Sequence, residues 1–306
     1  MSIRRACGVA VSSALVACGL TVAHVESDPE PVSSRDGGPS TDVPAPDSEG
    51  GASGDGGSGT GVDGGVSGVD GGTPIVDSGV TDGPPITKDA NGCPSGRGPA
   101  MVKVGSVCID TTAVTVAQYT VFLERNPSNA TSVPQCESDA THQPGVWPQS
   151  GADKPVVWVD WCDADAFCRW AGKQLCGNAT GGVLREDEWK SPDANPWYAA
   201  CSNFGERAFP YGNSHDSTAC NVNTNGASLA DVHAFPSCRG GAHPSLAQML
   251  GNVHEHVNAC SGNDCIAAGS SFKSRSTPPP DCSFVLDVSR TSRFDDMGIR
   301  CCAYVQ

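Results

Sequence analysis

The sequence predicts an α+β domain with little regular secondary structure that is held together by disulfide bonds. The region from residue 93 to the C-terminus contains 14 of the 16 cysteines and all six tryptophans. It shows two recognisable helices, and short strands such as Met101–Val104 and Val156–Val159 lie between long turn-rich stretches. A domain of this size with so few long elements needs covalent bridges or bound ions in place of long hydrogen-bonded ladders.

Each of the two helices is marked by a capping residue at its start. Thr115 precedes a helical pattern with an apolar face, which consists of Val116, Tyr119, Phe122 and Leu123. Asp160 precedes the second pattern, and Gly172 follows it as an exit residue. The inward residues of this second helix are Trp161, Ala164, Phe167, Cys168 and Ala171.

Residues 1–17 are predicted to be a secretion signal. Arg4 and Arg5 precede a short run of apolar and small residues, which is too short to span a bilayer. The run ends in Leu15-Val16-Ala17-Cys18, which resembles a bacterial lipobox and implies cleavage before Cys18 and acylation of that residue. An ordinary signal peptide with an incidental Cys18 is the alternative. The expected location is the bacterial cell envelope, at the outer membrane or cell surface, with the membrane as a partner through a lipidated Cys18.

Residues 18–92 form a low-complexity segment of Gly, Ser, Asp and Pro, in which Arg35 and Lys88 are nearly the only basic residues. This composition cannot bury enough apolar surface to offset the entropy of ordering, so we expect a disordered tether. Most of the net charge of −15 belongs to this tether and says little about the partners of the domain, residues 93–306. The domain itself is not basic, and nucleic acid is therefore not an expected partner.

The 14 cysteines of the domain are an even number in an exported chain, which predicts a disulfide framework of up to seven bridges. Spacing favours Cys93–Cys108 across a predicted hairpin and Cys260–Cys265 around a short turn, and it supports Cys220–Cys238 more weakly. No zinc spacing of the CxxC type occurs. Spacing leaves four cysteines without an assigned partner: Cys136, Cys162, Cys176 and Cys302.

A series of short motifs runs through this region in a fixed order. They are Met101-Val102, Ile109-Asp110-Thr111, Val114-Thr115-Val116, the run 155–160, Trp170-Ala171-Gly172-Lys173, Phe209-Pro210-Tyr211-Gly212, Gly251-Asn252-Val253 and Gly298-Ile299-Arg300-Cys301. In this order they resemble the formylglycine-generating enzyme (sulfatase-modifying factor) family. The resemblance covers about residues 100–302 and implies a fold similar to C-type lectins. It also implies two bridges, Cys168–Cys301 and Cys201–Cys282.

The middle of the chain departs from the family pattern. After Lys173 the family runs directly into a Leu-Pro-Thr-Glu-Ala-Glu-Trp element. Here residues 174–182 come first, and Glu186-Asp187-Glu188-Trp189 follows. The two ends of the family pattern are therefore intact, and its centre is rebuilt.

The family reaction oxidises a substrate cysteine to formylglycine with dioxygen, and two enzyme cysteines hold copper(I) for it. Where the family has these cysteines, this chain reads from Ser271 to Thr277, and Lys273 and Ser276 or Thr277 stand at the two places. An ammonium group repels a cation and a hydroxyl is a poor ligand for soft copper(I). We therefore expect no catalytic residue and no copper here, although the resemblance leaves the question of an enzyme open.

The resemblance also implies structural calcium, which prefers oxygen ligands. Asn252 and Glu255, with the carbonyl of Val253, match one site, and Asn221 with the carbonyl of Val222 matches part of a second. The alternative is that Asn252 and Glu255 only satisfy backbone groups in a buried turn.

Two family tryptophans are replaced by His254 and His256, which would face one side of a strand. With His233 and His243 upstream, a histidine metal site is a second hypothesis, but His-x-His alone is a weak signal, and ordinary buried histidines are favoured.

These observations predict a membrane-anchored lipoprotein whose domain is a binding or structural module without the copper-binding cysteine pair. Its partner would be a peptide, a glycan or an envelope protein. The alternative is a formylglycine-generating oxidase, or a metal-dependent oxidoreductase relative, that acts on a protein cysteine. No nucleophile elbow, P-loop or dinucleotide fingerprint is present to suggest another enzyme class.

Overall fold

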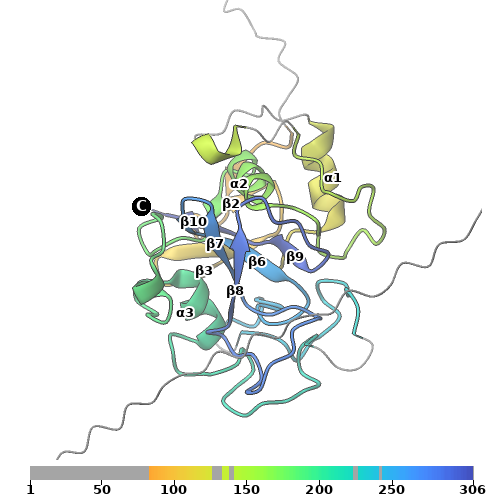
Figure 1. The fold of residues 1–306 in the computed structure, drawn as a ribbon. Helices are drawn as coiled ribbons and strands as arrows, with labels where there is room; N and C mark the ends of the chain where they lie inside the picture. The colour runs from red at the N-terminus through yellow and green to blue at the C-terminus, as the bar shows by residue number, and fades with distance from the viewer. Residues whose placement is uncertain (1–82, 126–132, 138–140, 223–226, 241–242, 306) are drawn as a thin grey trace, which may run out of the picture. The chain divides into compact units, whose positions relative to one another are not determined.

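Two four-stranded sheets form the centre of the computed structural model, which describes residues 83–125, 133–137, 141–222, 227–240 and 243–305 (Figure 1). One sheet has the order β3-β4-β10-β5 and the other β8-β7-β6-β9. The first consists of β3 (Met101–Val104), β4 (Val107–Asp110), β10 (Cys301–Tyr304) and β5 (Gln174–Leu175). The second consists of β8 (Val285–Ser289), β7 (Asp264–Ala268), β6 (His254–Ser261) and β9 (Met297–Ile299).

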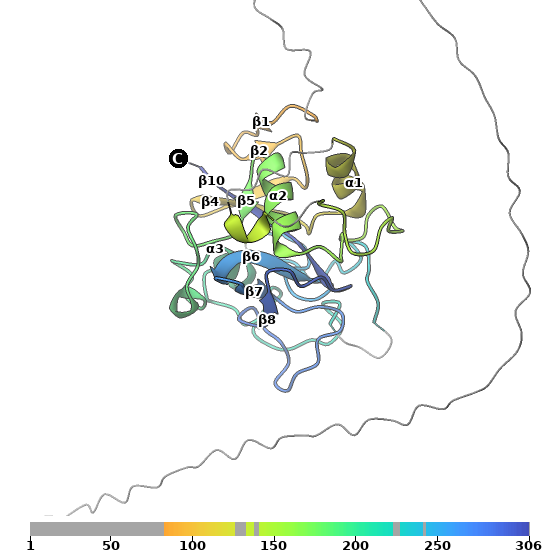
Figure 2. The same cartoon turned by 45° about the horizontal axis from the view of Figure 1, so that its top comes forward.

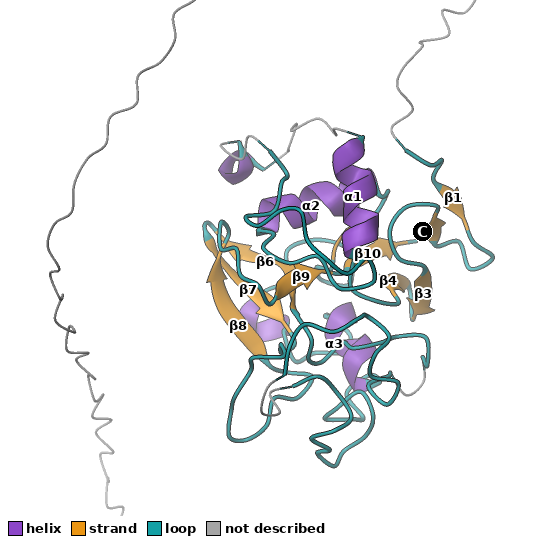
Figure 3. Cartoon of the chain, turned by 90° about the vertical axis from the view of Figure 1, so that its right-hand side faces the viewer, coloured by secondary structure: helices purple, strands orange, loops and turns teal. Residues whose placement is uncertain are grey.

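Helices cover the sheets from two sides. The first side carries α1 (Val116–Glu124) and α2 (Trp161–Trp170), and α3 (Pro196–Ser202) lies on the other side (Figures 1 and 3). The hydrophobic core is divided in the same way, since Phe122 and Phe167 belong to one buried cluster and Trp197 belongs to another. Two short 3₁₀ helices complete the set, Pro134–Cys136 and Glu186–Glu188.

The two predicted helices are confirmed, together with the capping residues that predicted them. The side chain of Thr115 accepts a hydrogen bond from the N–H of Gln118, and Asp160 accepts one from Asp163. In both helices the N3 side chain bonds back to the cap, which completes a capping box. Local sequence therefore fixes the start of each helix.

The predicted strand Val156–Val159 does not form. Its valines are buried as expected. The N–H of Val156 donates to the carbonyl of Val114, however, and the N–H of Trp158 donates to the carbonyl of Phe294. Trp158 has a positive φ of 58°, which interrupts the extended backbone. The segment thus satisfies its backbone groups with several distant loops rather than with one neighbouring strand.

Ordered structure begins before residue 93, the predicted start of the domain. β1 (Thr87–Lys88) pairs antiparallel with β2 (Pro94–Ser95) at the edge of the domain (Figure 2). Arg97 donates hydrogen bonds to the carbonyls of Pro84 and Trp170 and so holds this ribbon against the second helix. Residues 83–92 therefore belong with the domain, whereas the signal segment, Cys18 and the rest of the predicted tether fall outside the described residues.

Seven disulfides use all 14 cysteines of the domain. The structure contains the two bridges that the resemblance implied and the three that spacing favoured. It pairs the four unassigned cysteines as Cys136–Cys162 and Cys176–Cys302. The other five are Cys93–Cys108, Cys168–Cys301, Cys201–Cys282, Cys220–Cys238 and Cys260–Cys265.

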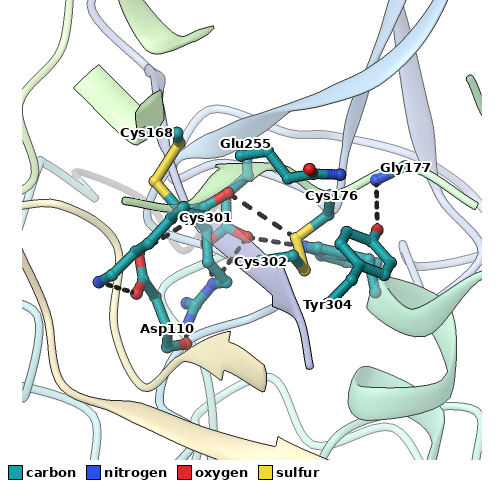
Figure 4. Close-up of a disulfide and its surroundings, with 12 residues drawn as sticks. Asp110, Cys168, Cys176, Gly177, Glu255, Cys301, Cys302 and Tyr304 are labelled. Atoms are coloured by element: carbon teal, nitrogen blue, oxygen red, sulfur yellow. Dashed lines mark hydrogen bonds and ion pairs between the residues drawn. A yellow bond between two sulfur atoms is a disulfide. The ribbon is translucent and has the colours of Figure 1, made fainter. Parts of the chain in front are cut away.

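Two of the bridges start from adjacent residues of β10. Successive side chains of a strand point to opposite faces, so Cys301 enters the cluster around α2 and bonds to Cys168, whereas Cys302 enters the opposite cluster and bonds to Cys176 (Figure 4). The last strand is thereby fastened to both sides of the sheet.

Within the described part of the chain, no helix combines the length and the apolar character needed to cross a bilayer.

Candidate functional site

The segment from Ser271 to Thr277, which follows β7, stands where the family carries its catalytic cysteines, and it contains no sulfur. The ammonium group of Lys273 forms an ion pair with Asp295, and the hydroxyl of Ser276 donates to the carbonyl of Pro278 at 2.7 Å. The cysteine that comes next in the chain, Cys282, is bonded to Cys201. Because every cysteine of residues 83–305 is in a disulfide, these residues do not fit a copper(I) ion that needs two thiolates.

Two of the residues expected to bind calcium lie together. The amide of Asn221 donates to Oδ1 of Asn252 at 3.1 Å, and that oxygen also accepts the N–H of Ala230 at 3.0 Å. Nδ2 of Asn252 donates to the carbonyl of Ala230, and the backbone N–H of Asn252 donates to the carbonyl of Asn221. Val222 and Val253 follow these residues in the same loops. The two asparagines therefore join the loops around residues 221, 230 and 252 by internal hydrogen bonds.

Glu255, the acidic residue expected at the calcium site, faces elsewhere. Both of its oxygens lie within 2.9 Å of Nε of Arg300, and Oε2 also accepts the indole N–H of Trp197. Glu255 and Arg300 are almost fully buried, with 1% and 0% of their surface exposed. Because its carboxylate is bound by a guanidinium, Glu255 is not available to a cation at Asn252, and the described residues as placed do not fit calcium. Calcium binding by this chain stays a prediction.

The buried pair of Glu255 and Arg300 belongs to a larger polar network next to the two disulfides of Cys301 and Cys302 (Figure 4). Arg300 also donates to the carbonyls of Asp110 and Ala247, and the carboxylate of Asp110 binds the ammonium of Lys173 at 2.6 Å. The other oxygen of Asp110 accepts the N–H of Cys301. Four motif residues are thus structural: Asp110 of β4, Glu255 of β6, Lys173 after α2 and Arg300 just before β10 are joined in one network.

The two histidines of β6 each bind a backbone carbonyl. His254 Nδ1 lies 2.9 Å from the oxygen of Gly269, and His256 Nε2 lies 3.1 Å from that of Val159. His233 is exposed. Among the described residues, no three His, Cys, Asp or Glu side chains gather as a metal site would require. His256 is accordingly an ordinary core histidine, and its burial has a consequence for stability.

We expect His256 to destabilise the folded domain as the pH falls from about 6.5 toward about 4. Burial, aided by the neighbouring His254, lowers the pKa of His256 from 6.5 to about 4, against the opposing effect of the hydrogen bond to Val159. In that window the unfolded chain takes up a proton that the folded chain does not, so the free energy of unfolding falls by up to about 1.4 kcal/mol per pH unit. Urea unfolding of the His256→Gln variant, which keeps an N–H donor, should show a flatter pH profile.

The matched control for this experiment is His233→Gln, because His233 is exposed. This variant should keep the slope of the unmodified protein. Equal slopes in all three proteins would contradict the assignment of the pH dependence to His256.

A groove with a volume of about 880 Å³ lies along strands β6, β7 and β8. Ala259, Ile266 and Val285 line its floor. The segment after residue 182 forms its wall, where Leu184 and Trp189 are buried and the side chain of Val183 is 50% exposed. Trp189 is held by a hydrogen bond from its indole N–H to the carbonyl of Ser283, two residues before β8 begins. This wall lies in residues 174–189, where the sequence departs from the family pattern. That departure is the signal in the sequence that points to the groove.

The rim of the groove is polar and more acidic than basic. Its carboxylates are Glu186, Asp187, Asp264 and Asp287, and its cations are Arg185 and Lys190. Arg185 already pairs with Asp187 and with Glu188. The remaining charge on the rim is therefore mainly negative, and it favours a ligand that carries positive charge.

Comparison with known proteins places the whole domain. Residues 68–304 match the family described as "Sulfatase-modifying factor enzyme 1-like domain". No curated protein matches the chain.

Solved structures similar to this chain include three that are under 20% identical to it. The crystal structure of CarF is 18% identical, with 65% of this chain and 87% of that chain covered and a TM-score of 0.44. PvdO from Pseudomonas aeruginosa is 16% identical, covering 65% and 80% with a TM-score of 0.44. Variable protein 1 of Treponema denticola is 16% identical, covering 65% and 84% with a TM-score of 0.42.

The family match spans well over half of the chain and agrees with the α+β architecture and the order of its motifs. The chain therefore belongs to the sulfatase-modifying factor enzyme 1-like family, with the fold of formylglycine-generating enzymes.

Proposed function

We propose that this protein is an exported lipoprotein, anchored to the cell envelope through Cys18, whose domain recognises a peptide and does not perform the copper-dependent oxidation. The seven bridges support export, because disulfides persist in oxidising compartments. The lack of sulfur between Ser271 and Thr277 supports the loss of copper chemistry. Mass spectrometry of the mature N-terminal peptide tests the anchor, since a Cys18 that carries no lipid on either its sulfur or its amino group would exclude it.

The groove beside β8 is the observation that carries the proposal. Its floor of Ala259, Ile266 and Val285 is apolar and its rim is acidic, so the ligand we propose is an extended peptide with apolar side chains and basic flanks. A space of about 880 Å³ accommodates several side chains of such a peptide. Apolar burial would supply the affinity, and the acidic rim would select the charge.

The decisive experiment measures the binding of labelled decapeptides by fluorescence anisotropy. One set combines Leu and Phe with Lys and Arg, and a matched set replaces the basic residues by Glu. We expect the basic set to bind and to change the emission of Trp189, which forms the groove wall. Val285→Asp should weaken binding about tenfold or more, which corresponds to about 1.4 kcal/mol.

Val146→Asp is the matched control, because Val146 is an exposed valine outside the groove, with 49% of its surface accessible. This variant should bind as tightly as the unmodified protein. If the acidic and basic sets bind equally, or if Val285→Asp has no effect, the groove is not the recognition site.

The oxidase alternative predicts a different result. With copper(I), oxygen and a cysteine-containing peptide, a formylglycine-generating enzyme consumes oxygen and produces an aldehyde. We expect neither, because no thiolate pair is available in residues 83–305. An aldehyde product in this assay would overturn the proposal directly, whatever the groove binds.

A further inference from the structure

A serine and a histidine meet at the place where the family cysteines are missing. The hydroxyl oxygen of Ser274 lies 3.3 Å from Nε2 of His254, although the two residues are twenty positions apart. His254 opens β6 and is 3% exposed, whereas Ser274 is half-buried in the turn that follows Ser271. A nucleophile and a base within hydrogen-bond reach, with the base held by a third group, are the parts of a covalent catalytic site.

The third group here is a backbone carbonyl, and it fixes the tautomer of the histidine. The oxygen of Gly269 lies 2.9 Å from Nδ1 of His254, and a carbonyl can only accept. Nδ1 therefore carries the proton, and Nε2 presents its lone pair to the hydroxyl of Ser274. The ring is also held by Phe284, which stacks on it at 6.2 Å between centroids.

The surroundings keep this histidine in its basic, neutral form. Burial lowers the pKa of His254, and the carboxylate of Asp296 opposes this effect. Asp296 itself accepts the hydroxyl of Ser271 at 2.6 Å, and the N–H of Ser271 donates to the oxygen of Ser274 at 2.9 Å. The proton of Ser274 has two acceptors within reach, Nε2 of His254 at 3.3 Å and the hydroxyl oxygen of Ser271 at 3.4 Å, and the imidazole nitrogen is the more basic of the two.

A second turn in the same domain shows that the turn alone does not require a histidine. The N–H of Ser289 donates to the hydroxyl of Ser292 at 3.1 Å, and the N–H of Ser292 donates back to the carbonyl of Ser289. The same two bonds close the turn from Ser271 to Ser274. The described hydrogen bonds of the Ser292 hydroxyl go to Ser289 and not to a histidine. The imidazole is therefore an addition to the first turn rather than part of its geometry.

We infer that Ser274 is a nucleophile with His254 as its general base, and that the site hydrolyses small carboxylic esters. The oxygen of Ser274 bonds to the ester carbonyl carbon while its proton moves to Nε2 of His254. The bond to the alcohol breaks, and the alcohol leaves with that proton. Water then attacks the acyl-serine in the same way, and the acid is released with Ser274 restored. This activity goes beyond peptide recognition and does not depend on the groove.

The test is covalent labelling of the complete protein with a fluorophosphonate probe, which reacts with activated serines. We expect a single label, located on Ser274 by peptide mapping, and turnover of p-nitrophenyl acetate by the same preparation. Ser274→Ala should abolish both signals, and His254→Gln should slow labelling by about a hundredfold or more, the range for loss of a general base. The control is Ser292→Ala, which changes the equivalent serine of the second turn, and the probe should label this variant at the original rate.

Three results would overturn the inference. They are a folded, unmodified protein that takes no label, a label that survives Ser274→Ala, and a labelling rate that His254→Gln leaves unchanged. Because the unmodified protein is itself informative, a variant that fails to fold does not remove the test. The peptide-binding experiment reports on Val285 and the groove, so the two proposals can fail separately.

Discussion

Replacing Arg300 by methionine should lower the free energy of unfolding by about 3–5 kcal/mol, the cost of breaking a buried ion pair from one side. Arg300 is fully buried, and its guanidinium binds Glu255 at 2.8 Å and the carbonyls of Asp110 and Ala247 at 2.6 and 2.8 Å. Methionine fills part of the space but leaves the carboxylate of Glu255 buried without its cation. Urea unfolding at neutral pH measures the loss.

The pH dependence of this variant identifies the cause. Burial raises the pKa of Glu255 above its ordinary value of 4.5, and Arg300 is the main group that opposes the rise. Without Arg300 the pKa rises further, so stability is retained where Glu255 is protonated and is lost as the pH rises through its folded pKa. The deficit should therefore be smallest in acid, and the double variant Arg300→Met with Glu255→Gln should recover part of it.

A surface pair supplies the control. Arg185 is 66% exposed and pairs with Asp187 and Glu188, and Arg185→Met should leave the urea midpoint nearly unchanged. If Arg300→Met and Arg185→Met unfold at the same urea concentration, the buried network does not stabilise the domain as inferred.

Local sequence predicted the elements whose determinants are local. The capping boxes at Thr115 and Asp160 lie within three residues of each helix start, and both helices form as expected. α3 has a similar signal in Asn195 and Pro196, the cap and first residue of the helix, but at seven residues it is too short to show a helical period in the sequence. The strand predicted after Pro155 does not form, because its backbone N–H groups bond to carbonyls of distant loops and not to a neighbouring strand.

The candidate sites depended on contacts that one sequence cannot reveal. Glu255 stands in a motif that suggests calcium, yet its partner Arg300 comes from a motif 45 positions away. Ser274 and His254 are likewise brought together by the hairpin between them. Motif resemblance could give the order of the segments, but the pairing of individual side chains follows from the packing of β6 against the C-terminal strands.

Removing the two bridges of β10, Cys168–Cys301 and Cys176–Cys302, should lower the free energy of unfolding by strongly non-additive amounts. Cys168–Cys301 and Cys176–Cys302 span 133 and 126 residues; Cys301 and Cys302 are adjacent, and Cys176 follows Cys168 by eight positions. Either bridge alone closes nearly the same long loop. Removing one as a double alanine variant therefore releases only a small ring and should cost about 3 kcal/mol, whereas removing the second should cost about 5 kcal/mol more, because the long loop is then opened.

Cys260–Cys265 is the reference for a short loop, since only five positions separate its ends. Its removal should cost about 2 kcal/mol in the same chain-entropy description and should add independently to either long-range variant. Denaturant unfolding of the two single-bridge variants, the variant without both and the short-loop variant completes the cycle. If removing the two bridges of β10 lowers the free energy of unfolding by equal and additive amounts, each bridge stabilises the packing of its own core cluster, and the two do not share the closure of one loop.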